Sequence, residues 1–150
     1  MQRTVMTTGL VILALVATAT AQENEYRIAE SPFQEDFEFT VNSDLEPQVE
    51  IAGVRWNRFG VHVKDAREID FDKSNPVTVE LEFVNTNPEG AKVLVIALFE
   101  DNNGVTLDRL ECAKVKAGND RLKESVQKYR ISGAVLRATR RVYLFCEVER

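Results

Sequence analysis

Hydrophobic and polar residues alternate along most of the chain after residue 48, which is the pattern of half-buried β-strands. The clearest run places apolar residues at every second position: Val77, Val79, Leu81 and Phe83. A similar run lies close to the C-terminus: Val142, Leu144, Cys146 and Val148. Residues 93–99 read VLVIALF and are apolar on both faces, which favours a central strand.

Shorter alternating runs and turn signals divide the rest of this region. Val49 and Ile51 form one run, Val54 and Trp56 form the next, and Gly53 between them suggests a β-bulge. A further run contains Phe59, Val61 and Val63. Pro, Gly and Asn gather at 75–76, 87–90, 101–104 and 118–120, which predicts turns. The Asn-Gly pair in the third of these favours a hairpin.

Residues 121–140 fit two secondary structures. Leu122, Val126 and Tyr129 would share one face of a short helix, whereas Gln127, Tyr129 and Ile131 fit a strand. We expect a loop or helical turn first and then a strand near 126–132. A second weak helical signal follows at Ala134, Val135 and Ala138.

Six or seven short strands without a long helix between them predict an all-β protein. The strand spacing favours a single antiparallel immunoglobulin-like β-sandwich over residues 48–150. A chain of 150 residues suits one such domain. We expect the domain to follow a signal peptide at 1–21 and an acidic N-terminal arm at 22–47.

The first 21 residues have the three parts of an export signal. Arg3 supplies a positive charge, residues 10–17 read LVILALVA, and Ala19-Thr20-Ala21 is an A-x-A cleavage site. The alternative is a membrane anchor, but a span needs about 20 apolar residues. We expect cleavage after Ala21 and a mature chain without a transmembrane segment, located in the periplasm or outside the cell.

Export changes the interpretation of the two cysteines. Cys112 and Cys146 are the only pair, so one intramolecular disulfide is possible. Oxidising compartments favour it, and closing this loop would stabilise the fold by roughly 3–4 kcal/mol. The alternative is two buried free thiols that pack as small hydrophobic side chains. We expect the disulfide.

Charge is divided unevenly along the chain. Residues 22–50 hold nine acids and one base, a net of −8, although the whole chain carries only −5. The segment 109–141 has a net charge of +7 and holds ten bases: Arg109, Lys114, Lys116, Arg121, Lys123, Lys128, Arg130, Arg137, Arg140 and Arg141. The acidic arm could lie on these bases, the bases could bind an anionic partner, or both groups could simply be solvated.

The candidate chemistry is sparse. His62 is the only histidine, it lies opposite in phase to the apolar face of its strand, and no motif supplies it with a partner. Asp70-x-Asp72-x-Ser74 copies the start of a calcium loop, but Asn75 and Leu81 stand where that loop needs Gly and Glu. No nucleotide-binding or serine-hydrolase motif occurs. We therefore expect no enzyme, metal or cofactor, and the net negative charge disfavours nucleic-acid binding.

One motif resembles a known family. Ile96-Ala97-Leu98-Phe99-Glu100, followed by Asp101-Asn102-Asn103-Gly104, is similar to the strand end and glycine turn of FxLYD domains. Leu98 is identical to the family pattern, whereas Ile96, Phe99 and Glu100 replace Phe, Tyr and Asp. The resemblance covers residues 48–149 and implies an exported β-sandwich without assigned catalytic residues.

These observations predict a non-enzymatic, exported β-sandwich that acts through protein binding or assembly. The partner would be another protein or an anionic polymer. The alternative is a binding module for an anionic glycan or another small ligand. A long uncovered strand edge would favour assembly through added strands, and a concave aromatic strip near Trp56, Tyr129 or Tyr143 would favour glycan binding.

Overall fold

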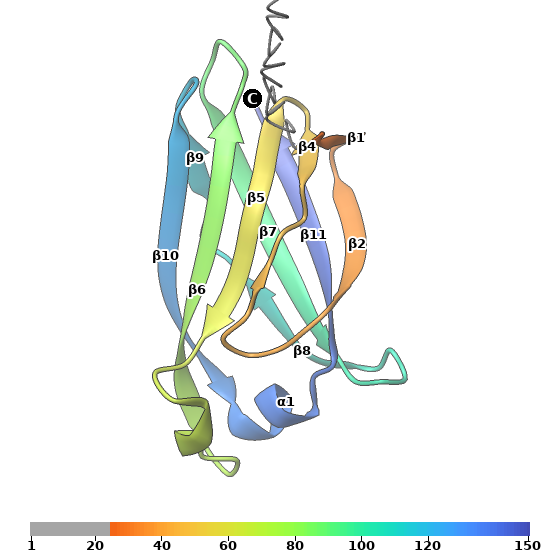
Figure 1. Ribbon diagram of the computed structural model, residues 1–150, viewed down its shortest axis with the longest axis vertical. Helices are drawn as coiled ribbons and strands as arrows, with labels where there is room; N and C mark the ends of the chain where they lie inside the picture. Colours follow the sequence, from red (N-terminus) through yellow and green to blue (C-terminus); the bar gives the residue numbers. More distant parts are fainter. Residues whose placement is uncertain (1–24) are drawn as a thin grey trace, which may run out of the picture.

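The protein is an all-β sandwich of two sheets, with its strands running along the long axis (Figure 1). The computed structural model describes residues 25–150. The predicted signal peptide at 1–21 lies outside these residues. None of the helices within 25–150 is long and apolar enough to cross a membrane.

Sheet A has six strands and sheet B has five. The strands of sheet A are β1 (Arg27–Ala29), β3 (Asp44–Leu45), β4 (Val49–Ile51), β5 (Val54–His62), β6 (Ser74–Asn85) and β10 (Leu122–Ser132). Those of sheet B are β2 (Phe33–Glu38), β7 (Ala91–Glu100), β8 (Thr106–Glu111), β9 (Val115–Ala117) and β11 (Arg141–Glu149). A 3₁₀ turn, η1 (Ala66–Glu68), and a short helix, α1 (Gly133–Ala138), lie at the lower end in Figure 1.

Strand order places β10 and β2 at opposite flanks of the sandwich. Sheet A runs β1-β4-β5-β6-β10, with β3 beside β5, and sheet B runs β2-β11-β7-β8, with β9 beside β7. All pairs are antiparallel except β1 with β4. Figure 1 shows β10 along the left side and β2 along the right.

The inner faces of the two sheets form the core. The predicted alternation in β6 and β11 is confirmed, because Leu81, Phe83 and Leu144 point inward and are buried. Trp56 of sheet A meets Phe33 of sheet B edge to face, with 6.3 Å between ring centroids. Aromatic pairs in this geometry add to the gain from burial alone.

The predicted bulge at Gly53 is wrong, because this glycine lies in a hairpin turn between β4 and β5. Ala52 and Gly53 both have positive φ, 48° and 78°, as tight hairpin turns require. The real bulge lies within β5, where the register shifts between Trp56 and Arg58. It joins two runs of opposite phase, so Phe59 returns to the buried face.

The acidic segment predicted as an arm supplies three strands to the sandwich: β1, β2 and β3. β2 pairs with β11, and Phe33 at its start is buried in the core. The chain then crosses from sheet B to sheet A, where Asp44 and Leu45 pair with β5. Residues 27–45 therefore belong to the two sheets rather than preceding them.

Residues 121–140, whose sequence fits either a helix or a strand, contain a strand followed by a helix. β10 begins at Leu122, so the loop or helical turn expected first is wrong, whereas the later helical signal corresponds to α1. The predicted turn at Asn75-Pro76 is also wrong, because both residues lie in β6. Pro76 is tolerated there because it lies before Thr78, the first residue of β6 that pairs with β5.

The predicted disulfide is absent: Cys112 and Cys146 are free and buried. Cys146 lies opposite Val95 of β7, and the N–H of Cys112 donates to the carbonyl of the same Val95 from the other side. One strand therefore separates the two cysteines. Two strand spacings of about 4.8 Å exceed the roughly 7 Å limit for the Cα separation of a disulfide.

Candidate functional site

The ten bases of segment 109–141 do not form one surface. Five lie outside β10 and β9 and are engaged within the chain: Arg109 pairs with Glu111, Lys114 with Glu149, Arg141 with Asp36, Arg137 lies over the Phe71 ring, and Arg140 donates to carbonyls. The others are Lys116 on β9, Arg121 between β9 and β10, and Lys123, Lys128 and Arg130 on β10. Of these, Arg130 also donates to a carbonyl, that of Ser74. Two candidate surfaces result, one along β10 and one around Lys116.

The first candidate is the outer edge of β10. This strand closes one side of sheet A and pairs only with β6, over the whole range 122–132. Among residues 25–150, no backbone group bonds to the backbone of its other edge, although the N–H and C=O of Ala113 bond to the side chains of Gln127 and Tyr129. An edge of this length extends about 35 Å, and roughly half of its N–H and C=O groups point away from β6.

The side chains of β10 divide between two faces. Ile131 is buried and points inward. Arg130 and Lys128, which lie one and three residues before it, therefore point outward, and both are exposed. Leu122 and Val126 are 57% and 65% exposed on the same outward face. Within the described residues, no carboxylate lies at ion-pair distance from the bases of β10. The edge therefore combines open backbone groups, exposed apolar side chains and unmatched positive charge.

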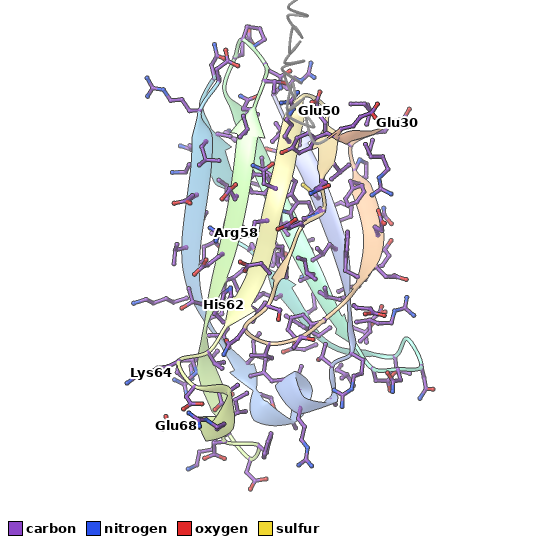
Figure 2. The ribbon with its side chains drawn as sticks, in the orientation of Figure 1. Glu30, Glu50, Arg58, His62, Lys64 and Glu68 are labelled. Carbon is purple, nitrogen blue, oxygen red and sulfur yellow. The ribbon has the colours of Figure 1, made fainter. Side chains whose placement is uncertain are left out.

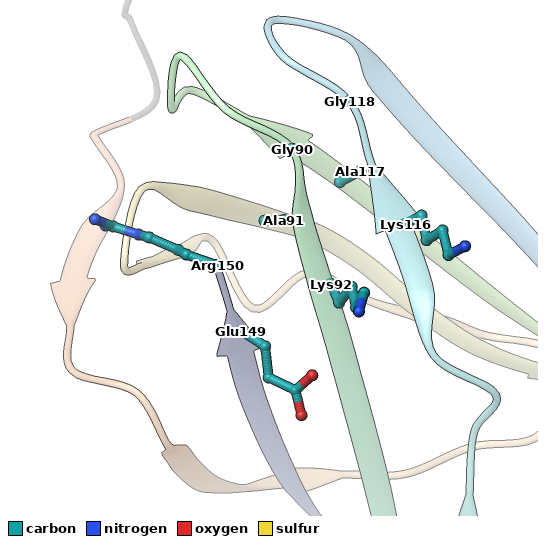
Figure 3. Close-up of a pocket in the computed structure, with 8 residues that line it drawn as sticks. All are labelled: Gly90, Ala91, Lys92, Lys116, Ala117, Gly118, Glu149 and Arg150. Atoms are coloured by element: carbon teal, nitrogen blue, oxygen red, sulfur yellow. The ribbon is translucent and has the colours of Figure 1, made fainter.

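The second candidate is a hollow of about 410 Å³ at the end of sheet B. Lys92 and Lys116 lie directly opposite each other on β7 and β9, and Figure 3 shows both side chains extending to the same side. Gly90 and Gly118 line the hollow as well. Arg150 also lines it, but its guanidinium donates to the Ala52 carbonyl and points away from the lysines (Figure 3).

The electrostatics of this hollow are set by one carboxylate. Glu149 lies opposite Lys92 across the sheet and is 2.6 Å from the ammonium of Lys114. That hydrogen bond lowers the pKa of Glu149 and raises the pKa of Lys114. Glu149 is paired with Lys114. On its other side, Lys92 lies directly opposite Lys116, so two like charges stand side by side. Like charges in this position destabilise a strand pair, and a bound anion would screen them.

A charged network covers the outer face of sheet A. Arg58 lies 3.4–3.7 Å from four carboxylates: Asp44, Glu80, Glu82 and Glu124. Below it along β5, His62 places its Nε2 2.9 Å from Asp44 (Figure 2). The sequence analysis found no partner for His62, and Asp44 is that partner. Gly60 makes the contact possible, since a Cβ there would lie 2.3 Å from the Asp44 oxygen.

The predicted aromatic strip is not assembled. Trp56 is fully buried between the sheets. The hydroxyl of Tyr129 accepts a hydrogen bond from the Ala113 N–H, and Tyr143 lies on β11 of the other sheet. These three aromatic residues therefore do not share an exposed surface.

The acidic loop at 65–75 is satisfied by its own neighbours. Asp70 pairs with Lys73, and Asp65 accepts hydrogen bonds from the backbone and side chain of Arg67. These contacts lower the pKa of both carboxyls. Within residues 25–150, no group of three or more potential metal ligands gathers at one point.

Sequence reasoning missed Lys92, Glu149 and Arg58. Each lies outside the segment where charge is concentrated, and each reaches its partners only through strand pairing. Strand periodicity offers one signal for Lys92. This residue lies just before the apolar run of β7, at a position that points outward. A search against protein-family models and a search of curated proteins found no match for this chain.

Proposed function

We propose that this chain is an exported, non-enzymatic binding protein that takes up an extended segment of a protein partner along the outer edge of β10. The open edge of β10 is the observation that carries this proposal. An added strand would satisfy backbone groups that the rest of the described chain leaves without strand partners. The export signal at 1–21, the immunoglobulin-like class and the FxLYD resemblance are parts of the same proposal.

The side chains of β10 supply selectivity for such a partner. Lysines on an edge strand oppose pairing with strands of like charge, so Lys123, Lys128 and Arg130 favour an acidic segment. The exposed Val126 offers an apolar contact in the middle of the strand. Backbone groups would provide affinity, and these alternating side chains would provide selectivity.

The test is a pull-down from the native extracellular or periplasmic fraction with three baits. The first is the unmodified chain. The second is V126K/K128E, which alters the β10 edge. The third is K92E/K116E, which alters the hollow lined by Lys92 and Lys116, called the lysine hollow below. A partner recovered by the first and third baits, but not by the second, supports strand addition at β10. Its binding is then repeated with purified components. A partner retained equally by all three baits would contradict the proposal.

The second candidate function is binding of an anionic glycan or another small anionic ligand in the lysine hollow. It is supported by the like-charged pair Lys92 and Lys116, which lie directly opposite each other. Titration with a sulfated and a carboxylated oligosaccharide tests it. Binding that is lost in K92E/K116E and kept in V126K/K128E would favour this function over strand addition.

A further inference from the structure

We propose that the acidic segment taken up by β10 is the β2 edge of a second copy of this chain, so that copies assemble head to tail. This inference rests on the proposed function and names its partner. In such an assembly, sheet A of one copy would continue into sheet B of the next. The opposite charges of the two flanks support this pairing.

β2 is the other open flank of the sandwich. It ends sheet B and pairs only with β11, and among residues 25–150 no backbone group bonds to its outer edge. The segment 25–38 holds five acids and one base, a net charge of −4, whereas 121–132 holds four bases and one acid, a net of +3. The two edges are therefore complementary in backbone and in charge.

The outward residues of β2 are the ones that would face the bases of β10. Asp36 and Glu38 are exposed, with side chains on the outer face, since Phe33 and Phe37 point toward the core. In an antiparallel pairing that sets Glu38 opposite Lys128, Asp36 falls opposite Arg130, because register advances one residue on each strand. Asp36 also pairs with Arg141 of its own chain, and the Arg130 guanidinium also donates to the Ser74 carbonyl, so this contact would add to existing ones. Opposite charges at such positions stabilise a strand pair.

The same charges disfavour symmetric pairing. Two β2 edges would set acids against acids. Two β10 edges would bring together strands that each carry a net positive charge. One antiparallel register would face Arg130 with Glu124 of the second copy, but it would set Lys128 opposite Val126 and so leave that base without an acid. Charge therefore favours the pairing of unlike edges.

Unlike edges give a heterologous contact, which repeats. After two copies pair, the pair still has one free β10 edge and one free β2 edge, so growth ends only when a ring closes and otherwise continues as a filament. Exposed apolar residues accompany both flanks: Ile28, on β1 at the β2 side, is 74% exposed, and Val126 lies on β10. Their burial would add to the backbone pairing.

The test is a charge swap followed by sedimentation velocity. The full chain is expressed with its export segment and purified as the cell processes it. Variant K128E/R130E carries acids at outward positions of both edges, and variant D36K/E38K carries bases at outward positions of both edges. We expect unmodified chain to self-associate with rising concentration, and less so at high salt, because the screening length shrinks from roughly 10 Å at 0.1 M to 3 Å at 1 M. Each variant alone should sediment as a monomer, and an equal mixture should reassemble.

Matched controls carry the same charge changes away from both edges. K64E/R67E and E68K/D72K alter the loop beyond β5, and both should self-associate like the unmodified chain. Thermal unfolding followed by circular dichroism establishes that every variant is folded. Four results would each overturn the head-to-tail pairing. The unmodified chain could remain monomeric at all concentrations, D36K/E38K could associate on its own, or the mixture could fail to reassemble. The fourth is that the control variants lose self-association as much as the edge variants do. Capture of a different protein at β10 would then still uphold the proposed function.

Discussion

The two flanks of the sandwich use charge and burial differently. On the β2 flank, Phe33 anchors the strand in the core, and two of the carboxylates are matched within the chain, Glu35 by Arg27 and Asp36 by Arg141. On the β10 flank, the outward side chains are exposed, and the bases of the strand have no ion-pair partner among the described residues. The β2 flank therefore has part of its charge matched within the chain, whereas the charge of β10 remains available to a partner.

The two cysteines report on these flanks separately. Cys146 lies opposite Phe33 of β2, and Cys112 precedes Ala113, whose N–H is held by Gln127 and Tyr129 of β10. Burial raises the pKa of both thiols from 9.0 to about 12. We expect native alkylation near pH 8 to be slowed roughly 1,000-fold relative to the unfolded chain, since each pKa unit lowers the thiolate fraction about tenfold.

Mass spectrometry after alkylation gives the measurement, and unfolding in denaturant without reductant should release both thiols. Because the folded pKa is raised, the stabilisation by the protonated thiols is fully present below about pH 9 and is lost as pH rises toward 12. A mass that is two hydrogens lower than that of the reduced chain would show a disulfide instead. Faster labelling of Cys112 than of Cys146 would show that the β10 flank opens more readily.

Phe33→Ala should destabilise the fold by about 3–5 kcal/mol, since it removes a buried ring that packs against Trp56. Val126→Ala on β10 is the matched control and should change the free energy of unfolding by no more than about 0.5 kcal/mol, because its side chain is exposed. Urea unfolding of both variants measures the difference. Similar losses in the two variants would contradict the distinction between an anchored and an accessible flank.

Gly133→Ala should affect the lower end of the β10 flank, where the strand enters α1. A Cβ at this position would lie 2.1 Å from the Asp70 carbonyl oxygen, a backbone atom that cannot rotate away. We expect a loss of roughly 1–3 kcal/mol from overpacking. Gly118→Ala is the control, because a Cβ there meets nothing within 4 Å, and its melting temperature should stay near that of the unmodified chain. Thermal unfolding of both variants measures the difference.

The smallest expected effect concerns the ion pair between Arg141 and Asp36. Both side chains are partly exposed, so a double-mutant cycle to alanine should give a coupling energy below about 1 kcal/mol, and less at high salt. Lys128→Ala, on the flank whose bases have no ion-pair partner among the described residues, should show no coupling with Asp36→Ala in the monomer. A coupling of several kcal/mol for Arg141 and Asp36 would mean that the β2 flank is held mainly by charge.

Periodicity predicted the strands that bury one full face. Leu81 of β6 and Leu144 of β11 lie in regular alternation, and both strands appear as expected. It failed where a local irregularity changed the phase, as at the bulge between Trp56 and Arg58. β10 was only half recognised, because its outward positions mix apolar with charged residues and so weaken the alternation.

The candidate surfaces were harder to predict, because strand pairing decides which charges meet. Lys92 lies between Glu149 and Lys116 in a row across three strands. The spacing of these residues along the chain does not predict that they are neighbours. The segment 109–141 concentrates bases in sequence, yet successive strands carry them to different faces and flanks. The cysteines show the same limit, since both face the core but β7 runs between them.

The position of β2 next to β11 also determines when the protein can fold. Glu38 pairs with Arg141, and Phe33 pairs with Cys146, so one side of sheet B joins the two ends of the described chain. Synthesis places Phe33 outside the ribosome long before its partner strand exists. Such distant contacts slow folding, and we expect a time constant of milliseconds to seconds rather than microseconds. Sheet B thus cannot be completed until β11 is made, which would suit the export that we propose, since an unfolded chain can cross a membrane as an extended thread.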